Sequence, residues 1–215
     1  MNHSSHRRQF NQILVTTLGA SLLPLQTQAQ TVASDGTVEI AGVKLPAEHT
    51  YQNTKLKLNG FGVRFRVIFQ VYVMALYTEQ PVTSSAAVLD AKTIKYAKLH
   101  MLRDVSGNEM GKLFARGIQD NAGREQFLNS YADLAKVGEI FAQQRLLKRG
   151  DSLAFGVHPK FGTQLFVREK EAGAAFSNPV FSSMLASIWF GNKPADDALK
   201  IALLGGKSSA NTNVN

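Results

Sequence analysis

Hydrophobic and polar residues alternate with a period of two through much of the first half of the chain. The alternation runs through Thr37 to Leu45, Lys55 to Leu58 and Thr93 to Leu102, and such alternation is typical of half-buried strands. The longest stretch, Asn59 to Glu79 (NGFGVRFRVIFQVYVMALYTE), reads as one long strand or two collinear strands. Its first four residues, NGFG, predict a turn. The first half is therefore predicted to be β-structure.

From Ser106 onward the apolar residues recur with helical spacing. Ser106 and Glu109 form a capping-box pattern, S-x-x-E, at the start of the first helix. Further elements are predicted as a helix over 124–149, a hairpin of 152–158 and 163–169 around the turn 159–162, and helices beginning near 178 and 195. Because no regular strand–helix–strand crossovers occur, this order predicts an α+β fold with an antiparallel sheet.

The two ends of the chain differ from the rest. Residues 1–29 combine Arg7 and Arg8, an apolar run from Ile13 to Leu25 and a small-residue pattern ending at Ala29, as in a cleaved export signal. The run is shorter than the roughly 20 residues that cross a bilayer, so no stable membrane anchor is expected. We therefore expect a periplasmic or secreted protein, with one domain over 30–205 and a disordered tail over 206–215. The residues RRQF partly match the twin-arginine export pattern.

Composition excludes several function classes. The chain of 215 residues has no cysteine, which rules out disulfides, thiolate metal sites and cysteine nucleophiles. Its formal charge of +8 is scattered along the sequence, so we expect no nucleic-acid binding. The histidines His49, His100 and His158 lack metal-ligand spacing, and GFGVRF has neither the third glycine nor the following helix of a dinucleotide-binding motif. We expect no metal and no cofactor.

Two arginines, Arg64 and Arg66, interrupt the apolar stretch that begins at Asn59. Strand alternation places both on one face with Tyr72, about 6–7 Å apart at two rises of about 3.3 Å. One interpretation is a half-solvated sheet face on which the arginine stems cover apolar neighbours. The other is the wall of a cleft in which a guanidinium binds an anionic group. The pattern alone leaves both open.

Three segments, GFGVRF with QVYVMALYTE, LHMLRDVSGNEMGKLF and FSSMLASIWFGNKPADDALKIALLG, give the chain a family resemblance from about Val38 to Gly205. The sequence is similar to secreted bacterial members of the chalcone isomerase-like family. The resemblance implies an open-faced β-sandwich, in which a layer of helices covers a large antiparallel sheet and a ligand cleft lies between the layers. Arg64 matches the arginine that stabilises an oxyanion in the plant enzymes.

The rest of the plant site matches less well. Asn108 is a possible counterpart of the plant asparagine, but the same stretch contains no tyrosine. On an unbroken strand Tyr72 would lie about 26 Å from Arg64. The resemblance therefore favours the fatty-acid-binding branch of the family, in which the arginine holds a carboxylate.

Three classes of function remain open on the sequence. The first is a non-catalytic binding protein for a small apolar carboxylate, with Arg64, Arg66, Tyr72 and Asn108 as ligand-binding residues. The second is a chalcone-flavanone-type isomerase, an intramolecular lyase, with Arg64 and Asn108 as catalytic residues. The third is a structural or partner-binding protein without a small ligand.

Overall fold

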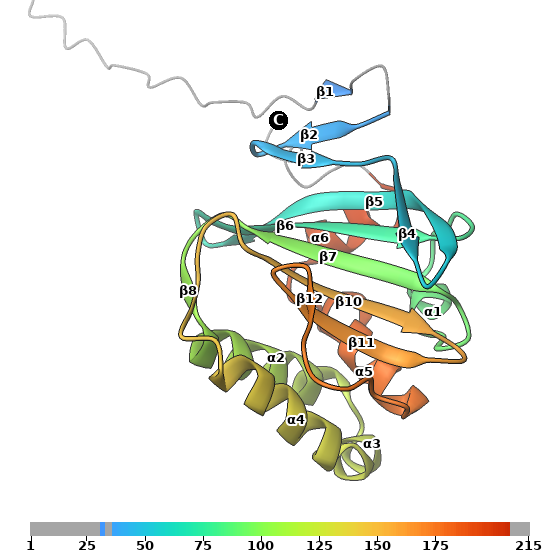
Figure 1. Ribbon diagram of the computed structural model, residues 1–215, viewed down its shortest axis with the longest axis vertical. Helices are drawn as coiled ribbons and strands as arrows, with labels where there is room; N and C mark the ends of the chain where they lie inside the picture. The colour runs from blue at the N-terminus through green and yellow to red at the C-terminus, as the bar shows by residue number, and fades with distance from the viewer. Residues whose placement is uncertain (1–30, 33–35, 207–215) are drawn as a thin grey trace, which may run out of the picture.

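A curled antiparallel sheet of seven strands is the centre of the computed structural model, which describes residues 31–32 and 36–206 (Figure 1). The strand order is β12-β11-β10-β7-β6-β5-β4. The bounds of these strands are β4 (Glu48–Tyr51), β5 (Thr54–Arg66), β6 (Phe69–Thr78), β7 (Lys95–Met101), β10 (Ser152–His158), β11 (Gly162–Val167) and β12 (Lys170–Glu171). The predicted export signal over 1–29, and all of the predicted disordered tail except Gly206, lie outside the described residues.

Helices cover one face of this sheet. They are α1 (Ser85–Leu89), α2 (Gly107–Asn121), α3 (Arg124–Asn129), α4 (Tyr131–Ala142), α5 (Pro179–Phe190) and α6 (Asp197–Leu203). The main core forms where α2, α4, α5 and α6 meet sheet residues such as Met74, Leu76 and Leu99. The predicted α+β fold with helices over a large antiparallel sheet is confirmed.

The opposite face carries a second, smaller core. There Ile40 and Leu45 pack with Val73, Ala75 and Tyr77, which alternate along β6 with the residues of the helix side. Ile40 and Leu45 come from a three-stranded sheet of β1 (Thr31–Val32), β2 (Val38–Ile40) and β3 (Val43–Leu45). A separate strand pair joins β8 (Val105–Ser106) to β9 (Leu146–Leu147).

The stretch from Asn59 to Glu79 is neither one strand nor two collinear strands, so that prediction is wrong. The chain reverses at Val67 and Ile68, and β6 runs back along β5. Hairpin turns of two residues usually contain Gly or Asn. This turn contains only β-branched apolar residues, with Val67 at a φ of 59°, and therefore gives no turn signal in the sequence.

The predicted turn at NGFG is also wrong, because these residues lie inside β5. Gly60 is needed there for a close approach of α6. A Cβ atom at Gly60 would lie 2.3 Å from the carbonyl oxygen of Ala202. Beside it, the Asn59 side chain donates to the carbonyls of Val82 and Leu203 at 2.9 and 2.8 Å. This segment fastens α6 to the sheet.

The predicted helices agree with the structure except over 124–149. The Ser106 hydroxyl accepts a bond from the Glu109 amide at 3.1 Å, and Asn178 caps α5 ahead of Pro179. The 124–149 segment instead breaks at Ser130 and ends its helix at Ala142, because Leu146 and Leu147 pair with the strand before α2. Across the described residues, no helix is both long and apolar enough to cross a membrane.

Candidate functional site

A bulge in β5 and the N-cap residue of α6, Asp196, position the end of β5. The register against β6 shifts between Arg64 and Phe65. The Phe65 amide donates to one carboxylate oxygen of Asp196 at 3.2 Å, and the other oxygen accepts from the Leu199 amide at 2.9 Å as the cap of α6. Asp196 thus ties the strand carrying Arg64 to the start of α6.

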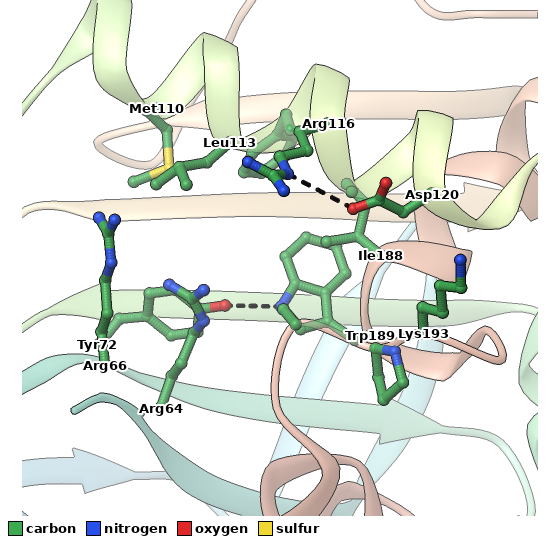
Figure 2. A pocket seen from close by; sticks show the side chains of 14 residues that line it. Arg64, Arg66, Tyr72, Met110, Leu113, Arg116, Asp120, Ile188, Trp189 and Lys193 are labelled. Atoms are coloured by element: carbon green, nitrogen blue, oxygen red, sulfur yellow. Dashed lines mark hydrogen bonds and ion pairs between the residues drawn. The ribbon is translucent and has the colours of Figure 1, made fainter.

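A cleft of about 300 Å³ opens between this part of the sheet and α2. Cationic and apolar side chains line the wall of this cleft (Figure 2). They come from β5, β6, α2, the end of α5 and the residues that follow α5. The cations are Arg64, Arg66, Arg116 and Lys193, the acid is Asp120, and the apolar side chains include Met110, Leu113, Phe114, Ile188 and Trp189. Within the described part of the chain, four cations and one carboxylate line the cleft, which gives it a positive potential.

Among the described cations of this wall, Arg64 is the one with a buried donor that has no hydrogen-bond partner. Its Nε atom is buried and has no hydrogen-bond partner, and none of the described carboxylates forms an ion pair with it. Its guanidinium carbon lies 5.6 Å from the centre of the Tyr72 ring. By contrast, Arg66 lies 3.6 Å from Glu109 and Arg116 lies 3.6 Å from Asp120. A buried donor without an acceptor is costly, and this unpaired Nε distinguishes Arg64 from the other cations of the wall.

Tyr72 supplies a second polar group beside Arg64. Its hydroxyl oxygen accepts a hydrogen bond from Trp189 Nε1 at 2.7 Å (Figure 2). Burial raises the pKa of Tyr72 to about 12, although the Arg64 charge and the Trp189 bond act in the opposite direction. The phenol is therefore neutral at pH 7. Its own proton has no acceptor within the described part of the chain, and it can be donated to a ligand oxygen.

The predicted 26 Å separation of Arg64 and Tyr72 is wrong, because the hairpin pairs the two residues directly across β5 and β6. Arg64, Arg66 and Tyr72 all line the cleft. Asn108 does not line it and is exposed in the first turn of α2. The structure therefore brings three of the four predicted site residues together.

Three residues of the cleft were not predicted as site residues: Trp189, Lys193 and Arg116. The first two belong to W-F-G-N-K-P, one of the blocks that carried the family resemblance. Asn121 at the end of α2 holds this block in place. Its side chain donates to the Lys193 carbonyl at 2.8 Å and accepts from the Lys193 amide at 2.7 Å. The family block was thus the available signal, whereas Arg116 had none beyond its position on α2.

Other candidate chemistry lies away from the cleft. His100 is on β7, where burial, helped by the Lys98 charge, lowers its pKa to about 4 against the opposing effect of Glu169. Lys95 is almost fully buried, and burial lowers its pKa to about 8. Its ammonium donates to the carbonyls of Asp90 and Thr93 and to the Thr93 hydroxyl, so its role is structural. No cluster of three or more potential metal ligands occurs within residues 31–32 and 36–206.

Comparisons with known proteins agree with the fold. A family model described as chalcone isomerase-like matches residues 37–205. The structure resembles the crystal structure of an Arabidopsis thaliana fatty-acid binding protein, with a TM-score of 0.59 and 12% identity over 82% of this chain and 96% of that one. An identity this low shows a common fold alone. No curated protein sequence matches the chain.

Proposed function

The chain belongs to the chalcone isomerase-like family, and we propose that this member binds a small apolar carboxylate, such as a fatty acid, in the cleft beside Arg64. The observation that carries the proposal is the buried Nε of Arg64 without a partner. A carboxylate there would accept bonds from the guanidinium and from the Tyr72 hydroxyl. Charge-assisted bonds of this kind are about twice as strong as neutral ones.

The rest of the cleft suits an apolar chain attached to that carboxylate. Met110, Leu113, Phe114 and Ile188 line it, and ligand pockets are mostly apolar with a few convergent polar groups. A volume of about 300 Å³ lies at the low end for such pockets. We therefore expect short or medium chains to fit better than long ones. The fatty-acid binding function of the Arabidopsis thaliana protein with this fold supports the same ligand class.

The residues of the cleft favour binding over catalysis. Ring closure of a chalcone requires positioned groups that transfer protons. Among the residues that the structure describes, no histidine lines the cleft, and the one carboxylate that does, Asp120, is already paired with Arg116. An isomerase is the second candidate, because a neutral Tyr72 beside an unpaired Arg64 could also stabilise an enolate oxygen. Stereoselective flavanone formation from a chalcone, lost in Arg64→Ala, would establish that alternative.

Native mass spectrometry of protein purified without detergent tests the binding proposal. We expect a co-purified acid at one equivalent, identified by extraction, and its loss from Arg64→Ala purified in the same way. If neither preparation carries an acid, adding dodecanoate before the measurement should give the same difference. Equal occupancy of the two proteins after this addition would contradict the proposal.

We also propose that residues 1–29 direct export and are cleaved after Ala29, so that the ligand is met outside the cytoplasm. The support is the basic start, short apolar run and small residues of this segment. N-terminal sequencing of the protein from its native cell should begin at Gln30. Mature protein that retains Met1 would contradict this, and export that fails when Arg7 and Arg8 are both replaced by lysine would identify the twin-arginine route.

A further inference from the structure

The tip of the β5–β6 hairpin exposes three consecutive large apolar side chains. Val67, Ile68 and Phe69 are 90%, 78% and 58% exposed. Elsewhere on the described surface, exposed large apolar side chains occur singly along the chain. One of them is Leu128 on α3, which is 61% exposed. Scattered exposed apolar residues are normal on protein surfaces, whereas a contiguous group at a protruding turn indicates a binding surface.

The conformation of the tip conflicts with its residue types. Val67 has a φ of 59°, in a region that β-branched residues rarely adopt and that Gly or Asn adopts readily. An Asn or Gly at this position would form the turn with less strain and less exposed apolar surface. Local preferences broken in this way occur mainly where function requires the side chains.

Basic residues lie beside the tip. Arg66 is its neighbour on β5, and the guanidinium carbon of Arg103 lies 5.9 Å from the centre of the Phe69 ring. The loop carrying Arg103 bonds to the hairpin through the Leu102 amide and the Val71 carbonyl at 3.0 Å. The same loop holds Arg149 through a bond between the Arg149 amide and Asp104 at 2.8 Å.

The acidic groups at this end of the sheet are fewer than the basic ones. Glu109 faces Arg66 at 3.6 Å, Asp104 accepts from the Arg149 amide, and Asp151 pairs with Arg168 at 2.9 Å. Arg103 and Lys148 have no carboxylate partner among the described residues. In Figure 1 the hairpin, the β7–β8 loop and the β9–β10 loop come together at one end of the sheet. This end of the sheet therefore combines exposed apolar side chains with an excess of basic residues.

We propose that Val67, Ile68 and Phe69, the hairpin tip, insert into the surface of an anionic phospholipid membrane while Arg66 and Arg103 contact lipid phosphates. Apolar residues flanked by cations favour the boundary between headgroups and acyl chains, and each cation near an anionic surface adds to the binding. Three side chains on a convex turn are too small for a stable protein interface, which buries about 800 Å² per partner. Because Arg66 also lines the cleft, docking would hold the cleft mouth at the lipid.

Vesicle co-sedimentation tests the proposal. The full mature chain should bind vesicles of phosphatidylcholine with about one third phosphatidylglycerol, and should bind pure phosphatidylcholine much more weakly. Combining Val67→Asn with Ile68→Ser should reduce binding to the anionic vesicles roughly ten- to a hundredfold, because each apolar side chain changes partitioning by about tenfold. Leu128→Ser removes a comparable exposed side chain far from the tip and should leave binding unchanged.

Insertion has its own readout. The chain has no cysteine, so an environment-sensitive dye can be attached at Ile68→Cys alone or, as a control, at Leu128→Cys alone. The dye at residue 68 should shift to the blue with anionic vesicles, and the dye at residue 128 should not. Val67→Asn alone should keep the melting temperature of the wild type or raise it, which separates lost docking from unfolding.

Two results would overturn the proposal: no binding of the wild type to anionic vesicles, or equal binding of the wild type and the Val67→Asn/Ile68→Ser protein. Equal binding would mean that the scattered positive charge alone is responsible. If the tip binds a protein instead of a membrane, the wild type should not co-sediment with the vesicles. The assay contains no fatty acid, so its failure would leave the proposed ligand in place. Conversely, a protein without a ligand would still show tip-dependent docking.

Discussion

Replacing Arg64 with alanine is expected to weaken binding of a medium-chain fatty acid by about one to two orders of magnitude. The substitution removes the guanidinium whose buried Nε lacks a protein partner and leaves the Tyr72 hydroxyl as the remaining neighbouring donor. A hydrogen bond to a charged group contributes about 1.5–3 kcal/mol, and each 1.4 kcal/mol changes the dissociation constant about tenfold. The apolar contacts of the chain are unchanged, so weak binding should persist.

Fluorescence of Trp189 provides the assay. It is the single tryptophan of the chain and lines the cleft, so titration with dodecanoate should change its emission directly. Arg66→Ala is the matched control, because Arg66 faces Glu109 and its side chain is 61% exposed. It should cost less than threefold in affinity. Arg64→Lys should restore only part of the affinity, because an ammonium cannot form the two parallel bonds of a guanidinium.

Equal dissociation constants for wild type and Arg64→Ala, with all four proteins folded by thermal unfolding, would refute this reasoning. Arg64 would then be a sheet-face residue. A loss in Arg66→Ala as large as that in Arg64→Ala would instead show that the cleft attracts anions by its overall charge.

Three further substitutions test the site and the fold. Tyr72→Phe should weaken dodecanoate binding about three- to tenfold and lower the melting temperature, since it removes one donor to the ligand and the acceptor of Trp189 Nε1; unchanged affinity would show that the hydroxyl does not meet the ligand. Gly60→Ala should destabilise the protein by several kcal/mol in urea unfolding, because its Cβ would meet the Ala202 carbonyl oxygen at 2.3 Å. The control Gly138→Ala, on α4 with nothing within 4 Å of the new Cβ, should stabilise the protein by up to about 1 kcal/mol. Similar effects of the two substitutions would contradict the packing described. His100 has a pKa of about 4 when folded against about 6.5 when unfolded, so unfolding takes up a proton between these values and stability should fall as the pH drops from 7 to 4.5. His100→Gln should flatten this dependence by about 1–2 kcal/mol in urea titrations at the two pH values, and an unchanged slope would assign the acid sensitivity to other groups.

The layers of the fold could be predicted from the sequence because their signals are local. The alternation around β7 and the β10–β11 hairpin, the Ser106 cap of α2 and the Asn178–Pro179 start of α5 all depend on a few neighbouring residues. The prediction of a helix over 124–149 was wrong because the end of that helix depends on a strand distant in the sequence. Leu146 and Leu147 leave the helix to pair with Val105 and Ser106, and this pairing has no local signature.

The site was predicted only in part, for a related reason. Arg64 could be identified from the family resemblance, but its direct pairing with Tyr72 could not, since the intervening turn at Val67 and Ile68 lacks turn-forming residues. An apparently continuous strand placed the two side chains far apart. Trp189 reaches them from α5, through a hydrogen bond that spans 117 positions of the chain. Such a contact follows from helix packing over the sheet and from no pattern along the sequence.

The most direct test of carboxylate binding is a comparison of dodecanoate and dodecanol, which have the same chain length and differ in the group offered to Arg64. Both are titrated into the wild-type protein at pH 7.5 while Trp189 emission is followed. If the Arg64 guanidinium and the Tyr72 hydroxyl hold a carboxylate, dodecanoate should bind at least tenfold more tightly than dodecanol, and Arg64→Ala should remove most of that preference. Equal affinities of the wild type for the acid and the alcohol would contradict a carboxylate site.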